Sequence, residues 1–111
     1  MTIEALRAYG ADVDDGLARC MNMEDFYLRL VNTLCGDTKL GELEQALGRH
    51  DLDAAFELAH ALKGMYANLS LTPLSVPVSE MTELLRARTD TDYSALLAQL
   101  KAEFERLRAL Q

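Results

Sequence analysis

A histidine on the polar side of a predicted helix is the residue of this chain best suited to do chemistry. At 100° per residue, the segment from Asp51 to Ser70 gathers its apolar side chains on one face, and His60 points well away from it. A neutral imidazole nitrogen is a nucleophile, and histidine side chains are largely neutral near pH 7. His60 is therefore a candidate to attack a phosphoryl group carried by a second molecule.

The residues that follow His60 suit this reaction. Lys63, one turn further on, is placed to offset the charge that a phosphoryl group brings and to bind its oxygens. Gly64 and then Ala67 continue the stripe on which His60 lies. Glycine inside a helix costs about 1 kcal/mol relative to alanine. Fold stability does not explain that cost, whereas clearance for a docking protein does.

Four exposed positions on the same helix are candidates for contacts with such a partner: Asp53, Glu57, Ala67 and Asn68. For Asp53 and Glu57, a solvated helix face is the simpler interpretation. Asn68 either hydrogen-bonds across the docking surface or has no partner.

Other interpretations of the reactive residues are weaker. A lone histidine is often an ordinary surface residue, and Glu57 with His60 has the Glu-x-x-His spacing of di-iron bundles. Such metal sites need a second motif of this kind, and this one faces outward. Cys20 and Cys35 have no CxxC or Cys/His neighbours, so buried free thiols are predicted. His50 precedes a helix cap and is interpreted as a turn residue.

The elements that position these residues are all helical, because apolar residues recur at helical spacing and no segment alternates like a strand. Gly10 ends the first helix, and Asn22, Asp51 and Thr72 are predicted N-caps. Pro77 leaves two alternatives: its helix begins near residue 75, or it begins early and bends. The predicted helices cover residues 2–9, 14–19, 22–35, 40–48 and 51–70, then a segment ending near 88, and, after a turn over residues 89–92, a last helix ending near 110.

Short connections between these helices favour antiparallel neighbours. We therefore predict an all-α fold, an antiparallel up-and-down four-helix bundle within residues 22–110, with additional short N-terminal helices over residues 2–20. A chain of 111 residues has no room for a second core, so residues 1–111 are predicted to form a single domain.

Composition excludes several functions. Eighteen acidic residues against 11 lysines and arginines give a net charge of −7, which disfavours binding to nucleic acid or to an anionic membrane. The apolar runs are too short for a transmembrane helix, and the start of the chain lacks a basic leader. These features predict a cytoplasmic protein, and the lack of a long heptad seam favours a monomer.

One stretch resembles the signature of histidine-containing phosphotransfer (HPt) domains, namely His60-Ala61-Leu62-Lys63-Gly64 followed by Ala67-Asn68-Leu69. The similarity spans roughly residues 51–107. The resemblance implies that His60 accepts a phosphoryl group, on Nε2, from the aspartate of a response-regulator receiver domain or from a histidine kinase, and passes it to another receiver domain. It also implies that Lys63 supports the phosphorylated state and that Gly64 gives the partner access.

The resemblance further implies a phosphocarrier and not an enzyme. The chain has no glycine-rich nucleotide loop and no acidic cluster for Mg²⁺, so no cofactor is expected in it and the metal would belong to the receiver domain. The alternative is a non-phosphorylated helical module that binds a signalling partner through the His60 face. Two residues depart from the family pattern: Ser70 stands where glycine is usual, and Pro77 is unusual in the next helix.

Overall fold

The computed structural model describes all 111 residues and contains seven α-helices and no strand, as the sequence predicts. The helices are α1 (Ile3–Tyr9), α2 (Val13–Arg19), α3 (Glu24–Leu34), α4 (Lys39–Gly48), α5 (Leu52–Asn68), α6 (Thr72–Arg86) and α7 (Ser94–Arg108).

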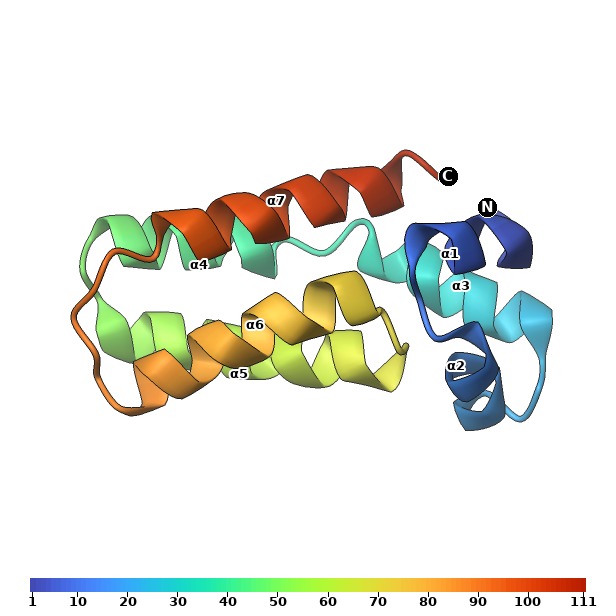
Figure 1. Cartoon of the computed structure of the whole chain (residues 1–111), viewed down its shortest axis with the longest axis horizontal. Coiled ribbons are helices and arrows are strands. Elements are labelled where there is room, and N and C mark those ends of the chain that lie inside the picture. Colours follow the sequence, from blue (N-terminus) through green and yellow to red (C-terminus); the bar gives the residue numbers. More distant parts are fainter.

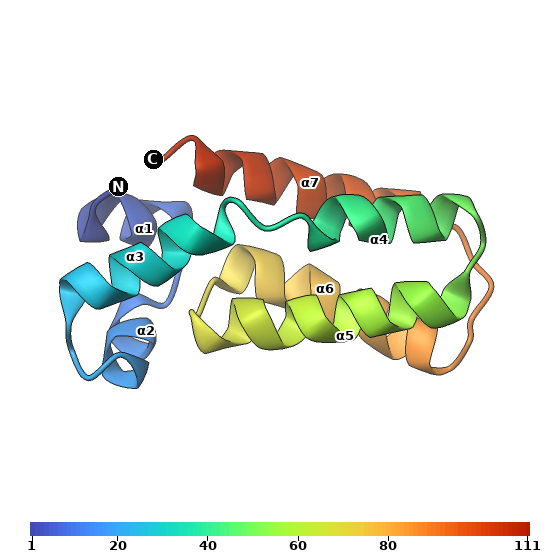
Figure 2. The ribbon, with the colours of Figure 1, turned by 180° about the vertical axis from the view of Figure 1, so that it is seen from behind.

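Helices α4 to α7 run lengthwise beside one another, while α1, α2 and α3 gather at one end of the molecule (Figure 1). Helix α5 packs against both α4 and α6, and α6 packs against α7. An ion pair of 2.8 Å between Lys101 and Glu44 joins α7 to α4. Seen from behind, α3 leads into α4 through a short connection (Figure 2). The chain has both its ends near α1.

Two helix boundaries agree with simple capping chemistry. The carboxylate of Asp51 accepts a hydrogen bond of 3.1 Å from the backbone N–H of Ala54, which satisfies one of the free donors at the start of α5. Gly10, with φ of 112°, ends α1 in the left-handed conformation that glycine adopts without strain. Both residues were predicted in these roles.

The predicted starts of α2 and α3 are wrong by one or two residues. Helix α2 begins at Val13, because Asp12 is its cap and accepts a hydrogen bond from the N–H of Asp15. Helix α3 begins after Met23, since Asn22 has φ of 57° and turns the chain before the helix starts. Neither start is visible in the spacing of apolar residues.

The start of α6 also differs from the prediction. Leu71 is its N-cap and is completely buried, so Thr72 is the first helical residue and Pro73 the second. The helix then continues through Pro77, which excludes a start near Ser75. Pro77 has no N–H to donate to the carbonyl of the residue four positions earlier, so α6 lacks that one bond.

The core is a cluster of 26 buried residues to which every helix contributes. From α5 it takes the predicted residues Ala55, Ala59, Leu62 and Tyr66. Several apolar residues at the margins of their helix faces are only half-buried, among them Phe26, Leu30, Leu58, Leu96 and Leu97.

The end of α5 is fixed by contacts with α2 and α3. The hydroxyl of Tyr27 donates a buried hydrogen bond of 2.8 Å to the carbonyl of Leu69. Ser70 has φ of 54°, a conformation that costs a residue with a Cβ about 1–2 kcal/mol. Its hydroxyl donates to the carboxylate of Asp15 at 2.5 Å, and its carbonyl accepts from the N–H of Asp12 at 2.9 Å. These bonds hold serine where the family usually has glycine.

Two further predictions concern single residues and membrane spans. Cys20 and Cys35 are buried free thiols, as expected, and burial raises the pKa of the Cys35 thiol.

None of the seven helices combines the length and the apolar character that crossing a bilayer requires.

Candidate functional site

His60 lies on the exposed side of α5, in the third turn of the helix. Its neighbour Ala59 is completely buried, and Leu62 is almost so, which fixes the rotation of the helix about its axis. The outward position predicted for His60 is therefore the one observed. The imidazole is open to a reaction partner.

The surface over Gly64, one turn after His60, is clear of other side chains. Gly64 is exposed, and a Cβ placed on it would meet no atom within 4 Å. Neither packing nor backbone conformation requires glycine at this position. Ala67, one turn further on, is also exposed. This stripe of α5 is thus low and uncluttered, as the spacing predicted.

An aromatic side chain supports the imidazole from the preceding turn. The ring of Phe56 stacks on that of His60, with centroids 5.7 Å apart and planes inclined by 22°. This is the offset arrangement that aromatic pairs prefer. Phe56 was not among the residues predicted to act at the site, although its position four residues before His60 was a signal that could have identified it.

Two arginines from the end of α6 cover the Phe56 ring. The guanidinium carbons of Arg86 and Arg88 lie 5.2 Å and 5.4 Å from its centroid, within the range of cation–π attraction. Arg88 also pairs with Asp53 at 2.8 Å. Asp53, predicted as a docking residue, therefore has an intramolecular partner. Two guanidinium groups, each paired with a carboxylate, thus lie over the ring that stacks on His60.

On the other side of His60, Lys63 reaches across to α6. Its Nζ lies 3.6 Å from Oε1 of Glu83. The same carboxylate accepts a hydrogen bond of 3.3 Å from Nε of Arg86. Arg86 is the main cause that holds the pKa of the Glu83 carboxyl below its usual range, and Lys63 makes a smaller contribution. Lys63 and Arg86 thus share one carboxylate beside the imidazole.

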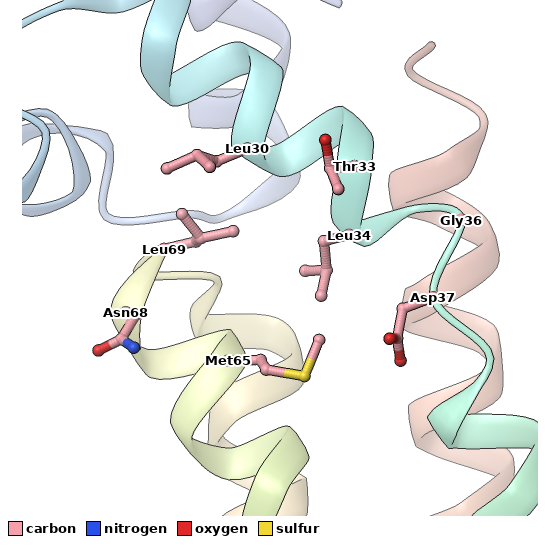
Figure 3. Close-up of a pocket in the computed structure, with 8 residues that line it drawn as sticks. All are labelled: Leu30, Thr33, Leu34, Gly36, Asp37, Met65, Asn68 and Leu69. Carbon is pink, nitrogen blue, oxygen red and sulfur yellow. The ribbon is translucent and has the colours of Figure 1, made fainter.

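Beyond Ala67, the His60 face leads to an open pocket of about 520 Å³. Figure 3 shows Leu30 and Leu34 of α3 on one side of this pocket, and Met65 of α5 and Leu69, which follows α5, on the other. Asn68 lies at its edge (Figure 3). The pocket is lined by Leu30, Thr33, Leu34, Gly36, Asp37, Met65, Asn68 and Leu69.

Comparison with known proteins identifies the family. A family model described as Hpt domain matches residues 36–110. The chain belongs to the Hpt domain family. Hpt domains are phosphocarriers that work with receiver domains and kinases in phosphorelays. Neither the curated proteins nor the solved structures include a match to the chain.

The family match divides the Hpt chain into two parts. Helices α4 to α7, with His60, lie inside the matched residues, and α1 to α3 lie outside them. Yet α3 supplies one side of the pocket beside Asn68. The residues before position 36 therefore adjoin the face on which the family motif lies.

The remaining residues considered as candidates in this Hpt domain take no part in the contacts described above. Glu57 is exposed and makes no ion pair, as a solvated residue would. No three His, Cys, Asp or Glu side chains are grouped so that they could hold a metal ion, so Glu57 and His60 lack the further ligands of a di-iron site. His50, with φ of 55°, is an exposed turn residue after α4.

Proposed function

We propose that this Hpt domain accepts a phosphoryl group on His60 from the aspartate of a response-regulator receiver domain, or from a histidine kinase, and passes it to another receiver domain. The observation that carries the proposal is the exposed imidazole beside the empty space over Gly64, within the family motif. Nε2 attacks phosphorus, and the new N–P bond forms as the bond from phosphorus to the aspartyl oxygen breaks. The aspartate leaves as a carboxylate with the electron pair.

The charges around His60 support the phosphorylated state in this proposal. A phosphoryl group brings nearly two negative charges, which favour nearby cations. Lys63 and Arg86 lie on either side of the shared Glu83 carboxylate and are the cations that meet it. The partner's receiver domain brings its own Mg²⁺, and the carrier itself needs no nucleotide or metal.

The size of a protein interface decides how much of α5 the partner covers. A standard interface buries about 800 Å² on each side, which corresponds to a disc of roughly 16 Å radius. Asn68 follows His60 by eight residues, or about 12 Å along the helix. A receiver domain centred on His60 therefore covers Gly64, Ala67 and Asn68 and reaches the pocket beyond. Glu57 and Asp53 lie within the same radius in the other direction.

We expect Leu30→Gln, in the α3 side of the pocket, to weaken binding of a receiver domain about fivefold, because a half-buried apolar contact worth about 1 kcal/mol is lost. Isothermal titration with the receiver domain measures the affinity. Leu97→Gln is the matched control, since Leu97 is a half-buried leucine of α7 that lines a separate pocket. Equal affinities for the two variants would remove α3 from the docking surface.

Phosphorylation of His60 is tested directly. We expect incubation with a radiolabelled, phosphorylated receiver domain to label the chain with an acid-labile, base-stable phosphoryl group, as expected of a phosphoramidate. His60→Gln keeps a polar side chain on an exposed position and should remain unlabelled. Labelling of His60→Gln to the level of the original chain would refute the proposal. Binding of the receiver domain without any label would instead identify a non-phosphorylated interaction module.

Several finer features are part of the same proposal. The four-helix bundle that carries the site consists of α4 to α7, fewer residues than the 22–110 predicted for it, and the domain acts as a monomer. It works in the cytoplasm, which is supported by two cysteines that remain reduced and buried.

A further inference from the structure

The contacts that begin at His60 form a connected series of side chains that spans two helices. Phe56 stacks on the imidazole, and Arg86 lies over Phe56. Glu83 pairs with Arg86 and also with Lys63, which lies one turn after His60 on α5. Glu83 is the only acidic side chain among them. Its carboxylate links Lys63 of α5 to Arg86 of α6.

This carboxylate has opposite effects before and after phosphorylation. While the imidazole is bare, Glu83 keeps Lys63 and Arg86 beside it, although all three side chains are more than a third exposed. Once a phosphoryl group is present, Glu83 repels it and competes with it for both cations. Exposed ion pairs are weak, and a phosphoryl group with nearly two charges and three acceptor oxygens is the stronger ligand.

We propose that Glu83 is an exchangeable counter-ion, which holds Lys63 and Arg86 beside the bare imidazole and releases them to the phosphoryl oxygens once the N–P bond has formed. The exchange itself makes and breaks no covalent bond. The inference rests on the phosphotransfer function proposed above and names the residue that sets the energy of the phosphorylated state.

The proposed role and a purely structural role predict opposite effects of removing Glu83 on the amount of phosphorylated chain. If Glu83 competes with the phosphoryl group, its removal favours the phosphorylated chain. If Glu83 only orders Lys63 and Arg86 for phosphate binding, its removal leaves them disordered and disfavours the phosphorylated chain. The direction of the change therefore decides between the two roles.

The experiment measures the phosphoryl-transfer equilibrium between this chain and a receiver domain. We expect Glu83→Gln to raise the equilibrium ratio of phosphorylated chain to phosphorylated receiver about two- to fivefold, an effect that shrinks as salt is added. The equilibrium is the correct measurement, because a change in docking alters only the rate of approach. Glu80→Gln is the matched control, since Glu80 is an exposed residue of α6 that pairs with no cation.

A second variant tests the exchange with Lys63 itself. In a Lys63→Gln background, we expect Glu83→Gln to raise the ratio by a smaller factor, because one of the two competing cations is gone. An unchanged or lowered ratio in Glu83→Gln, an equal rise in Glu80→Gln, or an undiminished rise in the Lys63→Gln background would each overturn the inference. Failure of the original chain to take any label would overturn the proposed function as well, so the two failures are distinguishable.

Discussion

Replacing Gly64 with leucine is expected to slow phosphotransfer to His60 by about a hundredfold, because displacing reacting groups by about 1 Å can cost that much in rate. The branched side chain projects into the empty space over Gly64, and under the docking proposed above it would hold the phosphoaspartate away from the imidazole. The substitution should not destabilise the fold. Leucine favours a helix over glycine by nearly 1 kcal/mol, so the free energy of unfolding should rise slightly.

Two measurements check this expectation together: the rate of label transfer from a phosphorylated receiver domain, and the urea midpoint of unfolding. Gly41→Leu is the control, since Gly41 is an exposed glycine of α4 whose Cβ would also meet no atom within 4 Å. It should gain stability without losing transfer. Transfer at the original rate in Gly64→Leu would show that clearance is not the reason for glycine at this position.

The second large effect concerns stability at the other end of the molecule. Gly16→Ala should lower the free energy of unfolding by about 2–3 kcal/mol, the cost of forcing an atom into a filled core and displacing a buried hydrogen bond. A Cβ on Gly16 would lie only 2.6–2.7 Å from three atoms of Tyr27. That ring is completely buried and is held by its hydrogen bond to the carbonyl of Leu69, so it cannot turn away without loss.

Urea unfolding followed by circular dichroism measures this change. Gly41→Ala serves as the control, because it makes the same substitution in open space and should gain stability through its helix propensity. If Gly16→Ala is as stable as the original chain, the Tyr27 ring can relocate at no cost, and α2 and α3 are held to the end of α5 less firmly than the contacts indicate.

The sequence was most informative about features that depend on the geometry of a single helix. The periodicity of α5 predicted that His60 and Gly64 lie outside and that Leu62 lies inside, because all three depend only on rotation about a single axis. The same holds for the caps at Gly10 and Asp51, which use local hydrogen bonds or local backbone freedom. The family motif lies on the same helix, so it was visible for the same reason.

The sequence was least informative where two helices meet. Glu83 and Arg86 reach the His60 site from α6, and the register between α5 and α6 depends on how their side chains interlock. The cap at Leu71 likewise depends on burial of its side chain. Ser70 was recognised as unusual, but its hydrogen bond to Asp15 joins residues 55 positions apart. No spacing rule within one segment could predict such a contact.

The pocket beside Asn68 has a consequence for signalling fidelity. Its α3 side is encoded by residues that lie before the family match and contribute nothing to the phosphoacceptor helix. Under the docking proposed above, exchanges at Leu30 or Thr33 would change which receiver is preferred while leaving every residue of α5 unaltered. Part of the discrimination between partners would then come from residues outside the family match, whereas His60 lies inside it.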